Sequence, residues 1–149
     1  MAAKAILVNQ GRDAMITYFR NSVTTPQSNK LYIADFVLLT GISGDPVVEK
    51  IWDGSGTGED LSSYMIVGDD GSPADARFAI DDRTQESGRK LRLWCVVPTN
   101  FSTDDATIDG IAILFKKQDN TYGLLGYGTR EGENKVAGTD LTLFFDVQM

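Results

Sequence analysis

The chain has 149 residues, a formal net charge of −7 and no histidine. Its length allows one domain with a hydrophobic core, and its hydrophobic fraction of 42% is ordinary for a globular protein. The lack of histidine excludes Ser-His-Asp and Cys-His catalytic systems and removes the commonest metal ligand. The acidic balance argues against nucleic acid as a partner, because phosphate backbones are also negative.

Cysteine content and apolar run lengths narrow the class of protein further. Cys95 is the single cysteine, so neither an internal disulfide nor a cysteine zinc cluster can form within the chain. No apolar run has the length of a membrane span, and the apolar part of the N-terminus is too short for a signal peptide. We therefore expect synthesis in a cytosol and no membrane partner.

The first half of the chain predicts one helix and one strong strand. Asn9 is a typical N-cap, and apolar residues at helical spacing predict a helix over 10–19. Residues 30–40 form a predicted strand with two apolar faces, which indicates burial on both sides, within the domain or between subunits. A further strand is expected over 61–67, and residues 81–88 are expected to be an exposed loop.

The second half shows the clearest alternation of apolar and polar residues. A strand over 89–97 places Cys95 among aliphatic residues on one face and Trp94 on the other. Residues 129–138 are expected to be a charged loop. The remaining predicted strands are 108–115, 122–127 and 141–147, the first two forming a hairpin. Together these elements predict a mainly β, β-sandwich-like fold with one short N-terminal α-helix, in a single domain over 1–149.

Candidate chemical sites are weak in this sequence. The glycine-rich segment 54–58 lacks the lysine and the third glycine of phosphate-binding motifs, so we interpret it as a flexible loop. Cys95 is expected to be a buried, inert thiol. The aspartates in the turns lack calcium-loop spacing; they are Asp69, Asp70, Asp75, Asp81 and Asp82. We predict no enzyme and no catalytic, cofactor-binding or metal-binding residue, although a carboxylate pair acting on a sugar stays formally open.

The order of several segments carries a resemblance to a known module. These segments are 5–14 with Asn9-Gln10-Gly11, 31–45, 92–98, 108–114, 123–127 and the lone Lys135 before the last strand. In this order they resemble the N-terminal collar-type attachment module of bacteriophage tail-fibre proteins. The chain departs from the family at Asp109, where the family usually has Glu. The family module continues into a shaft and a receptor-binding tip, so a chain of this length implies an adaptor or baseplate component.

The resemblance implies a structural virion protein, made in the host cytoplasm, that self-associates and docks other phage tail or baseplate proteins. It favours a trimer. The candidate interface anchors are Tyr32, Phe36, Trp52 and Trp94, because large aromatic residues dominate protein interfaces. A carbohydrate-binding module, in which Trp52 and Trp94 form a sugar-stacking platform, and a capsid or neck decoration protein stay open as alternatives.

Overall fold

The computed structural model describes residues 4–21, 32–66, 77–80, 82–99, 101, 103, 106–117, 120–135 and 138–148. In this part of the chain no helix has the length and apolar character needed to cross a membrane. The elements are β1 (Lys4–Leu7), α1 (Asn9–Asn21), β2 (Tyr32–Leu39), the 3-10 helix η1 (Ser62–Tyr64), β3 (Phe78–Ala79), β4 (Asp82–Ser87), β5 (Lys90–Val97), β6 (Ile108–Lys116), β7 (Tyr122–Glu133) and β8 (Leu141–Gln148).

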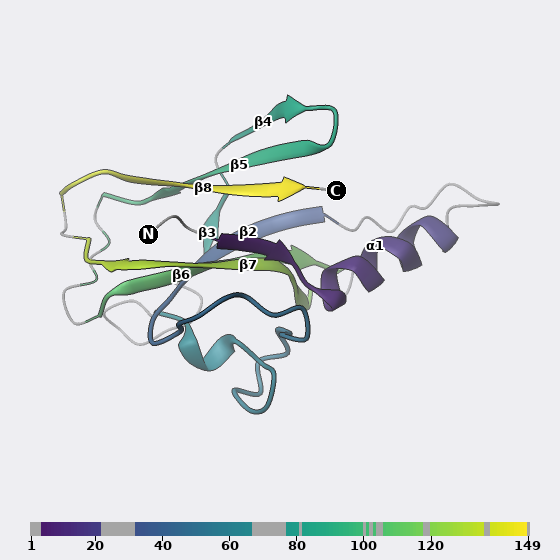
Figure 1. The fold of residues 1–149 in the computed structure, drawn as a ribbon, viewed down its shortest axis with the longest axis horizontal. Coiled ribbons are helices and arrows are strands. Elements are labelled where there is room, and N and C mark those ends of the chain that lie inside the picture. Colours follow the sequence, from purple (N-terminus) through teal and green to yellow (C-terminus); the bar gives the residue numbers. More distant parts are fainter. Residues whose placement is uncertain are drawn as a thin grey trace.

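The described strands form two antiparallel sheets, packed as in a sandwich (Figure 1). The five-stranded sheet has the order β1-β7-β6-β2-β3, and the three-stranded sheet has the order β4-β5-β8. The helix α1 follows β1 directly and extends away from the sheets. The fold is therefore mainly β with one short N-terminal helix, as the sequence predicts.

The main hydrophobic core lies between the two sheets. Alternate residues of a strand point to opposite faces, so each strand contributes every second side chain to this core. The inward residues of β5 and β8 meet those of β2 and β6, and the Cys95 thiol is fully buried among them. Members from these four strands are Leu93, Cys95, Val97, Leu143, Phe145, Val147, Phe36, Leu38, Ile108, Ile111, Ile113 and Phe115.

A second core lies on the other face of the five-stranded sheet. Residues 40–66, which contain little regular structure, pass across this face and cover it (Figure 1). Val37 and Leu39 point into this second core, whereas Phe36 and Leu38 point into the first, and all four side chains are fully buried. The two-faced strand is thus buried on both sides, as predicted, and its second cover is the chain's own 40–66 layer. A neighbouring subunit is not needed there.

Side chains of the sheet fix the 40–66 layer by binding its backbone. The Tyr127 hydroxyl accepts a hydrogen bond from the Val47 N–H at 2.7 Å, and the Thr129 hydroxyl donates to the Gly44 carbonyl at 2.8 Å. Burial raises the pKa of Tyr127 above its usual value, so the phenol stays protonated at neutral pH. A segment without strands or helices needs such contacts, because its polar groups otherwise lose water without compensation.

The side chains of Asp109 and Lys135 hold loops in place. The Asp109 carboxylate in β6 accepts a hydrogen bond from the Gly41 N–H at 2.8 Å. The Lys135 side chain is buried, and its ammonium donates to the Phe101 carbonyl at 2.7 Å and the Thr99 carbonyl at 3.3 Å. Asp109 therefore ties the start of the 40–66 layer to the sheet, and Lys135 ties the segment after β5 to the segment before β8.

Several sequence expectations differ from the structure. Residues 82–87 form the strand β4 instead of an exposed loop; β4 pairs with β5 alone and lies at the margin of the molecule (Figure 1). Residues 62–64 form a 3-10 turn, with an isolated bridge at Met65, instead of a strand. The strand β7 continues to Glu133 through the expected loop. The sequence also predicts a loop over 21–29 and a turn over 68–75; except for Asn21, which ends α1, these residues lie outside the described ones.

Candidate binding surface on the three-stranded sheet

The outer face of the three-stranded sheet, turned away from the core, gathers aromatic and charged side chains. In the β5–β8 register Arg92 lies opposite Asp146, and Trp94 lies opposite Phe144. Their neighbours in both strands point into the core, so these four side chains point outward. Trp94 and Phe144 are 37% and 49% exposed. We call these four residues, with Lys90, the outer patch.

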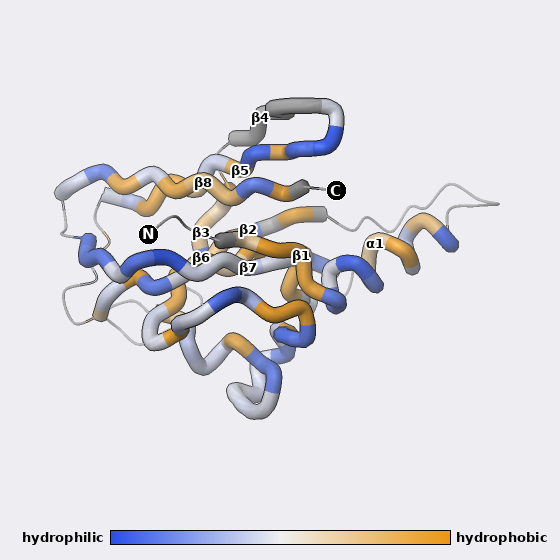
Figure 2. The backbone as a smooth tube through the Cα atoms, viewed as in Figure 1, coloured by the Kyte–Doolittle hydropathy of each residue, from blue (hydrophilic) through white to orange (hydrophobic). Residues whose placement is uncertain are grey.

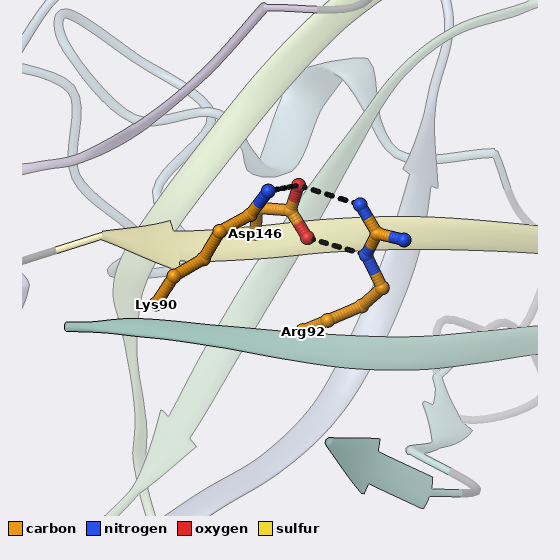
Figure 3. Close-up of polar contacts among 3 residues, drawn as sticks. All are labelled: Lys90, Arg92 and Asp146. Carbon is orange, nitrogen blue, oxygen red and sulfur yellow. Dashed lines mark hydrogen bonds and ion pairs between the residues drawn. The ribbon is translucent and has the colours of Figure 1, made fainter. Parts of the chain in front are cut away.

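The polar half of the outer patch centres on the Asp146 carboxylate (Figure 3). Arg92 binds it through two nitrogens, Nε to Oδ1 at 2.8 Å and Nη2 to Oδ2 at 3.2 Å, and Lys90 Nζ lies 3.3 Å from Oδ2. The hydrogen bonds from Arg92 lower the pKa of Asp146 against the opposing effect of partial burial, and Lys90 contributes to the lowering. The carboxylate is therefore ionised at neutral pH. Because the three side chains are about one-third exposed, the cluster adds little to stability.

The aromatic half of the outer patch is rigid but not flat. The Trp94 and Phe144 rings meet edge to face, with centroids 5.3 Å apart and planes at 89°. The Arg92 guanidinium carbon lies 5.2 Å from the Phe144 ring centroid, at cation–π distance. Tryptophan, arginine and phenylalanine are enriched at protein interfaces. The arrangement offers an apolar contact beside an ordered ion pair, both carried on paired strands.

The structure distributes the four predicted interface anchors differently. Phe36 is fully buried in the main core and Trp52 is 7% exposed in the second core, so neither faces a partner. Both serve instead as packing inside the chain. For Tyr32 only the backbone is described, so its predicted contact lies outside the described side chains. Of the three anchors whose side chains are described, Trp94 alone lies on the surface.

The sugar-stacking platform of Trp52 with Trp94, which the sequence left open as an alternative, does not form. Trp52 lies in the core beneath the 40–66 layer, and Trp94 lies on the outer face of the three-stranded sheet, so the two sheets separate them. Phe144 is the neighbour that the sequence reading missed. Its signal was present, because alternation in β8 places it on the same face as Thr142 and Asp146.

A second group of exposed apolar side chains lies on the helix α1. Ile16 and Phe19 are each 65% exposed. They belong to α1, the helix that extends beyond the sheets and carries an apolar stretch in its second half (Figures 1 and 2). Ala14 and Met15 pack partly against the main core and so anchor the helix. Residues three apart on a helix lie side by side, so Ile16 and Phe19 form one apolar spot.

The glycine-rich loop over 54–58 uses its donors internally. The buried Asp60 carboxylate accepts hydrogen bonds from the backbone N–H groups of Gly56, Asp53 and Ser62 and from the Ser62 hydroxyl. Burial alone would raise the pKa of Asp60, but these hydrogen bonds outweigh it and hold the pKa well below its usual value. The loop therefore surrounds a carboxylate of the same chain, where a phosphate loop would surround its ligand.

Metal ligation has no geometric support in the described residues. No three of their cysteine, aspartate and glutamate side chains come close enough together to hold an ion. The aspartates Asp69, Asp70, Asp75 and Asp81 lie outside the described residues, and only the backbone of Asp82 is described. The described part of the chain thus offers a contact surface as its clearest candidate site.

A cavity of about 330 Å³ opens where β1, β7 and β8 meet, next to the outer patch. Phe144 forms part of its wall, and most of the remaining lining is apolar. Arg130 lines it as well, in an ion pair with Glu133. Phe144 therefore belongs both to the outer patch and to the wall of this cavity.

No protein-family model, no curated protein and no solved structure matches the chain. The basis for a function is therefore the surface described above, together with the sequence resemblance to the tail-fibre attachment module.

Proposed function

We propose that the chain is a structural protein of a bacteriophage tail, a tail-fibre-like adaptor or baseplate component located in the virion. It acts by self-association and by docking other tail proteins. The observation that carries the proposal is the exposure of large apolar side chains at two separate places, Trp94 with Phe144 and Ile16 with Phe19. Exposed apolar clusters on a folded domain mark contact surfaces, because leaving them in water is unfavourable.

The residues that carry the resemblance support the proposal through their positions. Gln10 and Gly11, from the Asn-Gln-Gly helix start, and Lys135 all bind or approach backbone from distant segments. Such residues define an architecture and perform no chemistry. A resemblance built on them therefore concerns the shape of an attachment module.

The proposal contains no catalytic step. The chain has no histidine, the Cys95 thiol is buried, and the Asp60 and Asp146 carboxylates are held in hydrogen bonds by neighbouring residues. Groups held in this way are poor proton acceptors, because their charged form is already stabilised.

Carbohydrate binding would use the same aromatic surface. Sugars stack best on an open, flat aromatic face, and the 89° angle between the Trp94 and Phe144 rings does not provide a shared one. Irregular edge-to-face surfaces are filled more readily by protein side chains, so we favour a protein partner. A glycan array probed with the purified chain tests this preference, and specific binding to a sugar would reverse it.

The test of the proposed function is the composition of phage particles. Particles purified from cells that carry this coding sequence are analysed by mass spectrometry and by immunogold labelling with an antibody to the chain. We expect the chain in stoichiometric amount, with label at the tail. Purified particles that lack the chain, or label confined to the capsid or neck, would overturn the assignment to the tail.

A further inference from the structure

We propose that the outer patch is the contact between two copies of the chain, related by a two-fold axis parallel to the strands between β5 and β8. This inference rests on the self-association in the proposed function and names the surface that carries it. It also departs from the trimer that the resemblance favours, because a two-fold contact closes with two copies.

The β5–β8 register makes the outer patch complementary to itself. A two-fold axis in the contact plane, parallel to the strands, lays β5 of one copy on β8 of the other at the same height. Each residue then faces the counterpart of its own register partner. Arg92 faces the partner's Asp146, and Trp94 faces the partner's Phe144. Both relations occur twice, once on each side of the axis.

The charges in the outer patch suit this arrangement. Within one copy, Arg92 and Asp146 lie side by side with opposite sign. Across the axis the order is reversed, so the two ion pairs form a square in which every nearest neighbour has the opposite charge. A two-fold axis perpendicular to the strands would instead lay β5 of one copy on β5 of the other. Like charges would then face each other, which is costly when water is excluded. The charged row therefore fixes the register of the two copies.

The aromatic row supplies the apolar contact. Trp94 and Phe144 lie edge to face within one copy, which leaves both rings standing out from the sheet, partly exposed. Two such pairs brought together bury four rings near the axis. Packing of sheet on sheet occurs at about −30° between strand directions because each sheet is twisted, and the same twist is compatible with a two-fold axis.

The area of the outer face determines how tightly we expect the two copies to bind. The outer face is at most eight residues long and three strands wide, roughly 27 Å by 14 Å, which is smaller than a standard specific protein interface. We therefore expect a reversible dimer that dissociates in the micromolar range and is promoted by tethering in a larger assembly.

Sedimentation equilibrium over about 1 to 300 µM protein tests the contact, a range that brackets micromolar dissociation. The wild-type chain is expected to move from monomer to dimer. The W94A/F144A variant should weaken the dimer by about tenfold or more, because it removes the central aromatic contacts. The V47A variant is the control: it removes another exposed apolar side chain, from the 40–66 layer, and should leave the dimer unchanged. The I16A/F19A variant tests whether the exposed apolar residues of α1 carry the self-association instead. Circular dichroism verifies that all variants are folded.

Charge exchange tests the two-fold axis itself. The R92D variant carries two carboxylates in the charged row, and the D146R variant carries two guanidinium groups, so neither should dimerise alone. Mixed in equal amounts, the two variants should form a heterodimer, because position 92 of each faces position 146 of the other with opposite charge. The R92D/D146R double variant should dimerise like the wild type. Native mass spectrometry with one variant isotope-labelled identifies the heterodimer.

Distinct outcomes overturn the inference. A wild-type chain that stays monomeric over the whole range, a trimer, or a dimer that is weakened by I16A/F19A and not by W94A/F144A each rules out the contact. A mixture of R92D and D146R that stays monomeric rules out the axis. A dimer through the outer patch in a chain that is missing from phage particles overturns the proposed function alone. A monomeric chain found in particles overturns this inference and the self-association in the proposed function, and leaves the assignment to the tail in place.

Discussion

Gln10 binds both backbone polar groups of Trp52. Its side-chain oxygen accepts a hydrogen bond from the Trp52 N–H at 2.8 Å, and its side-chain nitrogen donates to the Trp52 carbonyl at 3.3 Å. The same oxygen accepts from the Leu124 N–H in β7 at 2.7 Å. One amide at the start of α1 thus joins the helix, the 40–66 layer and the five-stranded sheet.

Replacing Gln10 with alanine should destabilise the fold by about 2–4 kcal/mol. The N–H groups of Trp52 and Leu124 would lose their acceptor inside the protein, and each such loss costs about 1–3 kcal/mol. Urea unfolding followed by tryptophan fluorescence measures the change. The R12A variant alters an exposed residue of the same helix and should stay within about 0.5 kcal/mol of wild type. Equal effects of the two substitutions would show that the Gln10 contacts are unimportant.

Gly11 should not tolerate even alanine. A β-carbon at this position would overlap the backbone of Leu125, and backbone in a paired strand cannot move aside cheaply. We expect a loss of about 3 kcal/mol or more, although alanine is the better helix former. Gly88 in the β4–β5 turn is the control, because nothing lies within 4 Å of a β-carbon there. Thermal unfolding should show a large drop for G11A and almost none for G88A.

Asp60 should make the protein sensitive to acid. Its folded pKa is held below the usual value of about 3.9, so the folded state binds fewer protons than the unfolded state in that range. The contribution of Asp60 is complete above about pH 5 and is lost as the pH falls from about 4 through the folded pKa. The D60N variant should be less stable at pH 7 and should lose less further stability on acidification.

Free energies of unfolding measured between pH 7 and pH 2.5 give this comparison. Asp146 also has a lowered pKa, but it is one-third exposed and its contribution is screened by salt. Repeating the series in 0.5 M NaCl shortens the Debye length to roughly 4 Å and screens exposed charges. The difference between wild type and D60N should remain, because Asp60 is buried. Parallel pH curves for the two proteins would contradict the assignment.

Lys135 should be intolerant of a purely apolar replacement. Methionine has a similar length, but it cannot donate to the carbonyls of Thr99 and Phe101, and hydrogen bonds from a charged donor are worth about 1.5–3 kcal/mol. We expect K135M to lower the unfolding free energy by about 2 kcal/mol. Lys117 is exposed, and K117M should be nearly neutral. A neutral K135M would mean that the segments around β5 and β8 need no such link.

The strands that cover the main core were predictable from sequence because each carries a full alternation. In β5 the buried positions are Leu93, Cys95 and Val97, and in β8 they follow the same period of two. The two apolar faces of 32–39 also indicated double burial correctly. What covers the second face was not predictable, because residues 40–66 have no periodic pattern and are held by backbone contacts from distant side chains.

The missed strand β4 has a different cause. Its residues, Asp82 to Ser87, contain no aliphatic or aromatic side chain, and a strand that pairs on one side only at the margin of a sheet does not need an apolar face. Conversely, the sequence of 61–67 is apolar enough for a strand, but residues 62–64 form a 3-10 turn, and Leu61 and Ile66 fill separate cores. Whether each segment forms a strand depends on which strand it pairs with. A local sequence pattern does not show that partner.

The candidate site was only partly accessible from the sequence. Trp94 was placed correctly on the face opposite Cys95, but Phe36 and Trp52 are equally aromatic and lie in the cores. Nothing local distinguishes a core aromatic from a surface one when both faces of a strand are apolar. The ion pair and the ring contact of the outer patch depend on the β5–β8 register, which joins residues about 50 positions apart.

The pairing of β1 with β7 places a demand on how the protein is made. Lys4 pairs with Thr129 and Leu7 with Gly126, so β1 is synthesised about 120 residues before the strand with which it pairs. At usual rates of translation these about 120 residues take roughly 6–25 s to synthesise. Throughout that interval β1 has no partner strand, and the 40–66 layer lacks β7 to bind. The nascent chain therefore completes its fold late, and chains interrupted before β7 would be substrates for chaperones and proteases.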